Sequence, residues 1–349
     1  MTEFNPDYTK PQYLLSTCPM YKESPLIHIQ SIGELDVFIK DESHRMGLGS
    51  FKALGGIYAV ATLLAQKWLA VTGKNLTLEQ YSSVEFKEFS SLTTFICASA
   101  GNHGLAVASG AKIFGAKTKI YLSELVPEEF EKRLIEKLAV IVRSGKTYEE
   151  SVDAAIKEAN TGNGVLLADG SWQGYTCPPS LVMEGYTVIA NELREQFTKI
   201  KKWPTHVFIQ AGVGGLAASM AYMIREYWQQ QPEIIIVESE LAACLQTSHQ
   251  NGILTSVQGD VSIMGRLDCK APSLVAFNAL EKADVDYLTI SDKESIDATR
   301  ILQENNISTT PSGAAGLAGL LKMVKEEKLK AFVSTNSFQP LIIVTENKL

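Results

Sequence analysis

The chain carries, between residues 47 and 56, the stretch Gly47-Leu48-Gly49-Ser50-Phe51-Lys52-Ala53-Leu54-Gly55-Gly56. In it, Lys52 stands among four glycines and a serine, where an apolar helix pattern begins. A lysine in such tight surroundings can lose its proton, and a neutral amine can form a Schiff base with a carbonyl compound. A helix-start lysine after a glycine turn is the other interpretation, and this stretch alone does not decide between the two.

The composition is that of a globular protein with about two domains. The 349 residues are enough to bury an ordinary core, and 45% of them are hydrophobic and 20% charged. The net charge of −7 is spread without a basic stripe, so we do not expect nucleic acid as a partner. The five cysteines are scattered and form no CxxC pair. That spacing argues against a disulfide framework or a bound metal, and for a reducing compartment.

Targeting signals are not visible in the sequence. The segment Met1–Asp7 has neither a basic head nor an apolar run. We also find no apolar stretch of the length needed to cross a bilayer. We therefore expect a cytoplasmic protein without a membrane partner.

Short β-branched runs alternate with helical patterns over most of the chain. The expected strands are Leu35–Lys40, Thr94–Ala98, Lys117–Leu122, Val140–Arg143, Val165–Leu167, His206–Gln210, Ile234–Glu238, Tyr287–Ile290 and Leu341–Val344. The expected helices include Gly101–Phe114, Pro127–Leu138, Tyr148–Ala159, Leu181–Phe197, Leu216–Trp228, Lys293–Glu304 and Ser312–Lys325. Strands separated by helices predict parallel βαβ units, and continuously apolar strands predict sheets with helices on both faces. The predicted fold class is α/β.

Three successive strand–helix steps between Thr94 and Leu167 predict a compact domain inserted into a larger one. The polar linker Thr72–Ser91 and the loop Trp172–Pro179 are its expected boundaries. The small α/β domain then covers residues 89–171. The large domain is discontinuous and covers residues 1–88 and 172–349.

Two glycine-containing turns follow apolar strands and open helices, where open α/β sheets bind ligands. In Ser99-Ala100-Gly101-Asn102-His103-Gly104, small residues expose backbone N–H groups, and Asn102 can donate to an oxygen of a flat ligand. In Gln210-Ala211-Gly212-Val213-Gly214-Gly215-Leu216-Ala217, glycines let the backbone approach a phosphate at a helix N-terminus. Each turn alone is equally compatible with an ordinary strand-to-helix connection.

Two later segments add to this pattern. The stretch Thr310-Pro311-Ser312-Gly313-Ala314-Ala315-Gly316 opens a helix with small residues. After the last expected strand, Thr345 places a hydroxyl at the carboxyl end of the sheet.

The order of these segments is more specific than any one of them. It resembles the fold-type II enzymes that use pyridoxal 5′-phosphate (PLP), the group of threonine dehydratase, serine racemase and tryptophan synthase β. The resemblance runs from about Pro25 to Thr345, and within the group it is strongest to the diaminopropionate ammonia-lyase family. The segments that carry it are Asp41–Gly56, Asp169–Tyr175 with Pro178, Met183–Tyr186, Gly259–Cys269 and Ser312–Gly316.

The resemblance implies a tryptophan synthase β-like fold, in which two doubly wound parallel-sheet domains hold PLP between them. Lys52 would carry the cofactor and act as the catalytic amine. Asp169, unless it is only a turn residue before Gly170, would be catalytic through its attraction for a substrate ammonium group. Further cofactor contacts are implied for Phe51, Asn102, Gly212, Val213, Gly214, Gly215, Leu216 and Thr345. Contacts to a small amino-acid substrate are implied for Ser99, Ala100, Gly101, His103, Asp169 and Tyr175. A homodimer is implied as well.

The implied reaction is the α,β-elimination of 2,3-diaminopropionate to pyruvate and ammonia. In the lyase family an aspartate precedes Gly-Asn-His-Gly and is thought to take the Cα proton of the D-substrate. Here Ala100 stands at that position and cannot act as a base, so we expect a strong preference for the L-isomer. Three alternatives stay open. They are an L-serine or L-threonine dehydratase, a PLP-binding homologue without turnover, and a nicotinamide-dependent dehydrogenase that would use Gly212-x-Gly214 and Glu238.

Overall fold

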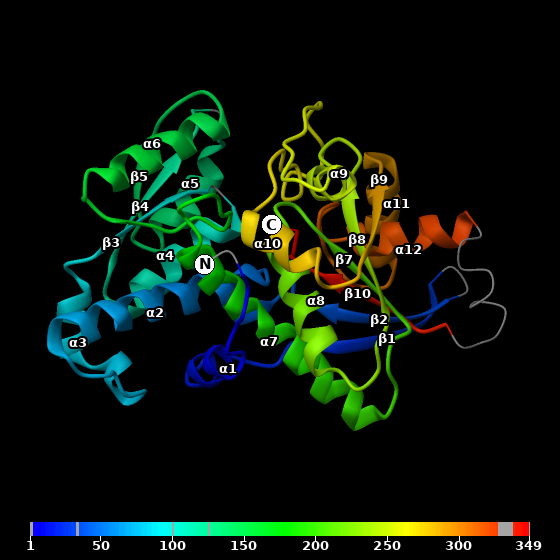
Figure 1. Ribbon diagram of the computed structural model, residues 1–349, viewed down its shortest axis with the longest axis horizontal. Helices are drawn as coiled ribbons and strands as arrows, with labels where there is room; N and C mark the ends of the chain where they lie inside the picture. The colour runs from blue at the N-terminus through cyan, green and yellow to red at the C-terminus, as the bar shows by residue number, and fades with distance from the viewer. Residues whose placement is uncertain (1–2, 33–34, 100, 125, 327–337, 349) are drawn as a thin grey trace.

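Two largely parallel sheets form the frame of the protein (Figure 1). The computed structural model describes residues 3–32, 35–99, 101–124, 126–326 and 338–348. The large sheet has six strands in the order β1-β2-β10-β7-β8-β9, and the small sheet has four in the order β5-β4-β3-β6. Every strand pair is parallel except β1 with β2. The predicted α/β class with parallel sheets is therefore confirmed.

The strands and helices have the following bounds. The strands are β1 (Leu26–Ile32), β2 (Leu35–Asp41), β3 (Thr94–Ala98), β4 (Lys117–Leu122), β5 (Val140–Arg143), β6 (Val165–Leu166), β7 (His206–Gln210), β8 (Glu233–Ser239), β9 (Asp286–Ile290) and β10 (Pro340–Val344). The helices are α1 (Thr9–Ser16), α2 (Lys52–Thr72), α3 (Val84–Ser90), α4 (Asn102–Phe114), α5 (Glu128–Ile135), α6 (Tyr148–Asn160), α7 (Cys177–Ile200), α8 (Gly215–Tyr227), α9 (Cys244–Asn251), α10 (Leu274–Leu280), α11 (Asp292–Glu304) and α12 (Ala315–Lys325). Short 3₁₀ helices cover Arg45–Gly47 and Glu79–Ser82.

Helices cover both faces of the large sheet. Successive residues of a strand point to opposite faces, so each strand contributes to two separate cores. On β7, Val207 and Ile209 join the core that contains α2, α7 and α8, whereas Phe208 joins the core under α11 and α12. Figure 1 shows the small sheet with α4, α5 and α6 on one side of the molecule and the large sheet on the other. Each expected strand is present with an end shifted by at most one residue.

The structure differs from the expected elements in several places. Helices α1, α9 and α10 were not among the expected ones, and α7 begins at Cys177, inside the expected loop Trp172–Pro179. The antiparallel edge strand β1 was not predicted, and the expected linker Thr72–Ser91 contains α3. This helix forms because Phe86 is completely buried, with its ring 5.9 Å from that of Trp68 on α2. Ser83 caps it by accepting a hydrogen bond from the Phe86 N–H at 3.1 Å. The domain boundaries at residues 88/89 and 171/172 stay a prediction.

Helix α2 corrects one further expectation. Its 21 residues are long and apolar enough to cross a bilayer by length and composition alone, so the statement that no such stretch exists is wrong. Of its most apolar window, 56% is buried inside the protein. Its close neighbours are α4 and α7, as expected for a core helix.

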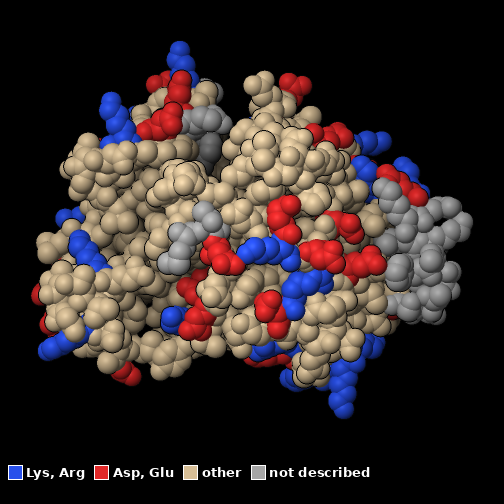
Figure 2. All heavy atoms as spheres, viewed as in Figure 1, with Lys and Arg blue, Asp and Glu red and all other residues tan. Residues whose placement is uncertain are grey.

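Charges of both signs are interspersed on the surface. On the face in Figure 2, lysine and arginine side chains lie among aspartates and glutamates rather than in one broad basic area. On that face the excess negative charge is therefore spread rather than concentrated.

Candidate active site

The last strand of the chain brings the lysine segment and the C-terminal segment together. β10 lies inside the large sheet, where Ile342 is in register with Ile39 of β2 and Phe208 of β7. As a result, the backbone N–H of Phe51 donates to the Thr345 carbonyl at 3.2 Å. Lys52, the first residue of α2, therefore starts beside the carboxyl end of β10.

The side chain of Lys52 reaches across to the small sheet. Its Nζ donates a short hydrogen bond to Oδ2 of Asp169, which lies just beyond β6. Both side chains are only about a fifth exposed, at 21% and 22%. The two catalytic residues predicted from sequence are thus in direct contact, although 117 residues separate them along the chain.

The contact fixes the charge state of both groups. Burial alone would lower the pKa of Lys52, but the attraction of the Asp169 carboxylate outweighs it and raises that pKa above its usual value. Burial would raise the pKa of Asp169, but Lys52 holds it well below its usual range. Lys52 is therefore an ammonium group here, and the expectation of a neutral amine is wrong for this arrangement. A neutral amine requires that the Asp169 carboxylate be shielded from it.

The predicted phosphate loop connects β7 to α8. Gly214 has a φ of +101°, a left-handed conformation that a side chain disfavours. A Cβ at Gly212 would lie 2.9 Å from Cys269 Sγ and 3.1 Å from the Arg266 carbonyl oxygen, so a side chain there would force its neighbours to shift. Among the described residues, no side chain caps the N-terminus of α8, so its first N–H groups and the positive end of its dipole can face an anion.

The Thr345 hydroxyl is held in place at the carboxyl end of β10. It accepts a hydrogen bond from Gln210 Nε2 at 3.3 Å, and the same nitrogen donates to the Ile343 carbonyl at 2.9 Å. Thr345 is 5% exposed. Nearby, the ring of Phe51 packs edge-on against Tyr186 with centroids 4.9 Å apart.

The start of α4 contacts the segment that follows β10 through Asn102, a predicted cofactor contact. Asn102 donates its side-chain amide to the carboxylate of Glu346, the residue after Thr345. Ser99 Oγ accepts from the Gly101 N–H at 3.3 Å. Ala100, which carries the predicted L-isomer preference, lies outside the described residues.

His103 presents an unused acceptor near the catalytic pair. Its Nε2 lies 3.0 Å from the Leu167 carbonyl oxygen, which can only accept, so Nε2 carries the proton and Nδ1 the lone pair. Among the described residues Nδ1 has no hydrogen-bond partner. Burial lowers the pKa of His103, so the ring is neutral.

Tyr175 holds the strand end that carries Asp169. Its hydroxyl donates to the Leu166 carbonyl at 2.9 Å and accepts from the Ala168 N–H at 3.1 Å. Its ring stacks on Trp172 with centroids 4.4 Å apart. The predicted substrate contact of Tyr175 is thus limited to the ring, because the backbone already uses the hydroxyl.

Glu346 and Arg266 were not predicted from the sequence. Glu346 is 4% exposed, and its carboxylate accepts from Thr310 Oγ1 at 2.5 Å in addition to Asn102. Arg266 Nε lies 3.6 Å from the same carboxylate. A charged residue two positions after an apolar strand was a signal for Glu346, whereas the irregular loop around Arg266 offered none.

The residue that suggested a dehydrogenase has another role. Both oxygens of Glu238 accept backbone N–H groups of α9, from Leu245 at 2.9 Å and Gln246 at 2.7 Å. Burial raises the pKa of Glu238 to about 7. A buried carboxylate that caps a helix is not available to a nucleotide ribose. Glu238 therefore no longer supports the interpretation as a nicotinamide-dependent dehydrogenase.

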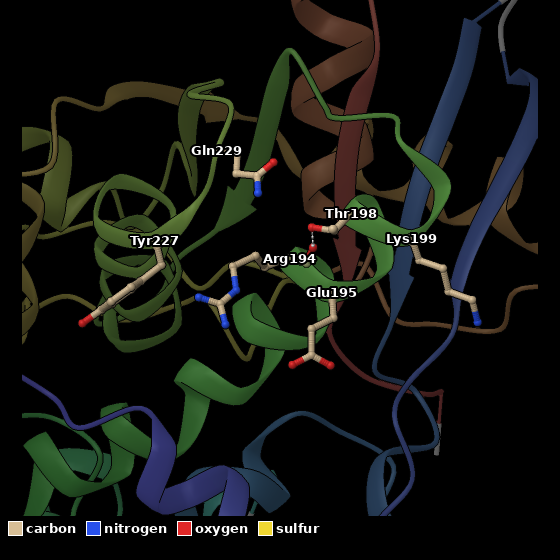
Figure 3. Close-up of a pocket in the computed structure, with 6 residues that line it drawn as sticks. All are labelled: Arg194, Glu195, Thr198, Lys199, Tyr227 and Gln229. Carbon is tan, nitrogen blue, oxygen red and sulfur yellow. Dashed lines mark hydrogen bonds between the residues drawn. The ribbon is translucent and has the colours of Figure 1, made fainter.

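Two open hollows on the surface lie apart from these groups. One, of about 400 Å³, is lined by residues such as Arg194 and Tyr227 at the ends of α7 and α8 (Figure 3). The other, of about 590 Å³, borders Trp203 and Gln230. Neither is lined by Lys52 or Asp169, so neither belongs to the candidate site.

Comparison with known families assigns this arrangement. The family described as "Pyridoxal-phosphate dependent enzyme" matches residues 18–334. The chain belongs to this family. Among its relatives, the diaminopropionate ammonia-lyase of Escherichia coli strain K12 is 31% identical over 312 residues, which cover 86% of this chain and 77% of that protein. The enzyme of the same name from Salmonella typhimurium is 33% identical over 317 residues, with 86% and 78% covered.

Solved structures agree with that membership. The holo diaminopropionate ammonia-lyase of Escherichia coli superimposes with a TM-score of 0.85 at 26% identity, covering 97% of this chain and 88% of the other. Maize serine racemase superimposes with a TM-score of 0.76 at 20% identity, covering 99% of this chain and 94% of the other, which shows the shared fold. The predicted fold-type II architecture is confirmed.

PLP is the cofactor of this family, and the residues present fit it. Its aldehyde needs an amine, which Lys52 offers inside the protein. Its phosphate needs N–H donors and a close backbone, which the uncapped N-terminus of α8 and Gly212 provide. Its pyridine nitrogen suits a neutral hydroxyl such as that of Thr345. The individual roles of these residues stay predictions.

Proposed function

We propose that this protein catalyses the α,β-elimination of L-2,3-diaminopropionate, giving one pyruvate and two ammonia per substrate with the uptake of one water. The observation that supports this most is the contact between Asp169 and Lys52. Asp169 is a carboxylate that holds an ammonium group within the site. A substrate with a second amino group can supply that ammonium once Lys52 is engaged elsewhere.

The chemistry divides between cofactor and chain. When bound, PLP withdraws electrons from the Cα carbon of the amino acid attached to it. Lys52 removes the Cα proton as a general base, a role that needs its neutral form. Asp169 binds the β-ammonium group, which replaces the Lys52 ammonium as its partner and then departs as ammonia.

The residue at position 100 supports the choice of isomer. The L- and D-substrates present the Cα proton on opposite faces, and Lys52 serves one of them. The methyl group of Ala100 cannot accept a proton. We infer a strong preference for the L-isomer.

The names of the relatives support the substrate class. Two of the relatives above are diaminopropionate ammonia-lyases, and a probable D-serine dehydratase of Fusobacterium nucleatum is 28% identical over 325 residues. A hydroxyl leaving group carries no charge and does not need Asp169, so the diamine is the better match to this site.

The experiment measures ammonia and pyruvate together. The purified holoenzyme is supplied in turn with L-2,3-diaminopropionate, its D-isomer, L-serine and L-threonine. We expect turnover of the L-diamine with two ammonia per pyruvate, and much slower turnover of the others. One ammonia per pyruvate from L-serine as the best substrate would contradict the proposal, and so would comparable rates for the two diamine isomers.

Likeness to the family supports a dimer, and the scattered cysteines support a reducing compartment. We infer a homodimer in the cytoplasm. Light scattering after size exclusion tests the dimer, since a single-chain mass would contradict it.

A further inference from the structure

Arg266 joins elements that belong to both sheets. It lies between α9 and α10, and its backbone N–H donates to Ser312 Oγ at 3.1 Å. Its guanidinium carbon lies 5.5 Å from the ring centre of Phe130 on α5. The side chain is 35% exposed, so it can meet a ligand from solvent.

The guanidinium also covers the start of α4. A Cβ placed on Gly101 would lie 3.5 Å from both Cζ and Nε of Arg266 and 3.6 Å from Nη1. The 13-residue helix α4 has no side-chain cap at Gly101. A full positive charge and the positive end of a helix dipole therefore meet at one point.

Within the described ranges, Glu346 attracts the guanidinium of Arg266 but leaves hydrogen-bond donors of that group free. Arg266 Nε is 3.6 Å from the carboxylate, longer than a good hydrogen bond, while Asn102 and Thr310 donate to the same group. In the part of the chain that the structure describes, neither Nη atom of Arg266 has a hydrogen-bond partner. Burial raises the pKa of Glu346 above its usual value, and the attraction of Arg266 opposes that shift.

We propose that Arg266 binds the α-carboxylate of the amino-acid substrate, and that Glu346 is a positioning residue that keeps the guanidinium over Gly101. The proposal rests on the proposed function for its substrate class. It gives the two ends of the substrate opposite partners: the carboxylate meets Arg266 and the start of α4, and the β-ammonium meets Asp169. The planar guanidinium can donate two parallel hydrogen bonds to a carboxylate.

The competing interpretation is that Arg266 has a purely structural role and stabilises the packing of the two domains through its contact with Phe130. A structural contact of this kind stabilises the site for every ligand alike. A carboxylate partner acts only on ligands that carry the negative charge. The two interpretations are separated by a pair of ligands of which only one carries the carboxylate charge.

The test measures equilibrium binding of L-alanine and of L-alanine methyl ester to the holoenzyme, from the change in the visible spectrum. Neither ligand has a β-substituent that can leave, so binding is measured without turnover. We expect Arg266→Ala to weaken L-alanine binding by about 10- to 100-fold and ester binding by less than about threefold. Arg266→Lys keeps the positive charge but cannot donate two parallel hydrogen bonds. Its affinity for L-alanine should lie between those of the wild type and Arg266→Ala. The matched control is Arg300→Ala, at an exposed arginine that pairs with Asp297, and it should leave both affinities unchanged.

Equal losses for acid and ester, or no loss for either, would overturn the role of Arg266. If Arg266→Ala fails to fold, Arg266→Lys carries the same comparison. For Glu346→Gln we expect a smaller loss, confined to L-alanine. An unchanged ratio of acid to ester affinity in that variant would overturn the positioning role.

The proposed function can fail separately. If the enzyme released one ammonia per pyruvate from L-serine, the lyase assignment would be wrong while the ratio of acid to ester affinity still measured the role of Arg266.

Discussion

At the scale of single residues, the site depends on one carboxylate that can serve two cations. Asp169 holds the Lys52 ammonium in the structure described here. The same contact raises the pKa of Lys52 and thereby suppresses the neutral amine that the reaction requires. A substrate ammonium that takes over Asp169 would both bind itself and leave the lysine free to react.

Replacing this carboxylate should have two opposite effects. In Asp169→Asn, we expect kcat/KM for L-2,3-diaminopropionate to fall by about 10² to 10⁴, because the β-ammonium loses its partner. In the cofactor-free protein, the acylation rate of Lys52 at fixed pH should rise, since the pKa of Lys52 falls when the negative charge is removed. The measurements are steady-state kinetics and peptide mapping after limited acylation.

Asp153→Asn, at an exposed aspartate on α6, is the control for both measurements. Slower acylation of Lys52 in Asp169→Asn would show that the pair does not set the charge of the lysine. Unchanged kinetics would show that Asp169 does not bind the substrate.

Sequence reasoning found the residues that follow strand ends in glycine-containing turns. Asn102 stands in such a turn, Lys52 follows the glycine stretch after β2, and Thr345 directly follows β10; the parallel strands bring these segments together. Arg266 could not be found in this way, because its position depends on how an irregular loop folds back over α4. The charge of Lys52 was also missed, since the contact with Asp169 joins two distant parts of the chain.

At the scale of elements, α2 and α7 pack closely where Gly55 of α2 meets Gly185 of α7. A Cβ on Gly185 would lie 2.6 Å from the Gly55 Cα atom and 2.8 Å from the Leu54 carbonyl oxygen. Such contacts leave no room for a methyl group. The start of α2, which carries Lys52, is therefore positioned by its close packing on α7.

Gly185→Ala tests this packing. We expect a loss of about 1 to 3 kcal/mol in the free energy of unfolding, because the added methyl forces the helix backbones apart. Urea titration followed by circular dichroism measures it. Gly265→Ala is the control, since a Cβ there meets nothing within 4 Å. Equal stability of the two variants would contradict the close packing.

A buried charge cluster holds the segment between β2 and α2, which leads to Lys52. On α7, Glu192 accepts from Lys40 Nζ at 2.7 Å and from Arg45 Nη2 at 2.8 Å, and all three side chains are at most 2% exposed. Arg45 also pairs with Glu42 at 2.7 Å. Because Arg45 lies between β2 and α2, the cluster ties the segment that leads to Lys52 onto α7.

Glu192→Ala should destabilise the protein by about 3 to 5 kcal/mol, because it leaves two buried cations without their shared partner. Glu195→Ala, at an exposed position on the same helix, should change the stability by less than about 0.5 kcal/mol. Chemical denaturation of both variants gives the comparison. A loss below about 1 kcal/mol for Glu192→Ala would mean that the cluster is not a stabilising tie.

The regular elements were predictable where their pattern is periodic. All nine expected strands are present, since short β-branched runs between helical patterns identify parallel strands. The strand β1 was missed because polar residues interrupt its apolar ones, so it lacks the continuous apolar run of a buried strand. Helix α3 was missed because the contacts of Phe86 and Phe89 with Trp68, rather than a long pattern, hold it in place.

At the scale of the whole molecule, the site exists only because two sheets face each other. Lys52 and Thr345 come from the large sheet, whereas Asn102 and Asp169 come from the small one. The hydrogen bonds from Lys52 to Asp169 and from Asn102 to Glu346 span the gap between them. Cofactor, substrate and both charged partners can therefore be engaged together only when the sheets keep this arrangement.

The central claim is that Lys52 carries PLP covalently. Borohydride reduction of the holoenzyme followed by mass mapping of its peptides tests it most directly, with Lys52→Arg as the control. We predict a single reduced adduct on the peptide that contains Lys52 and none in the variant. An adduct on another lysine, or no adduct in a holoenzyme that is active, would contradict the account.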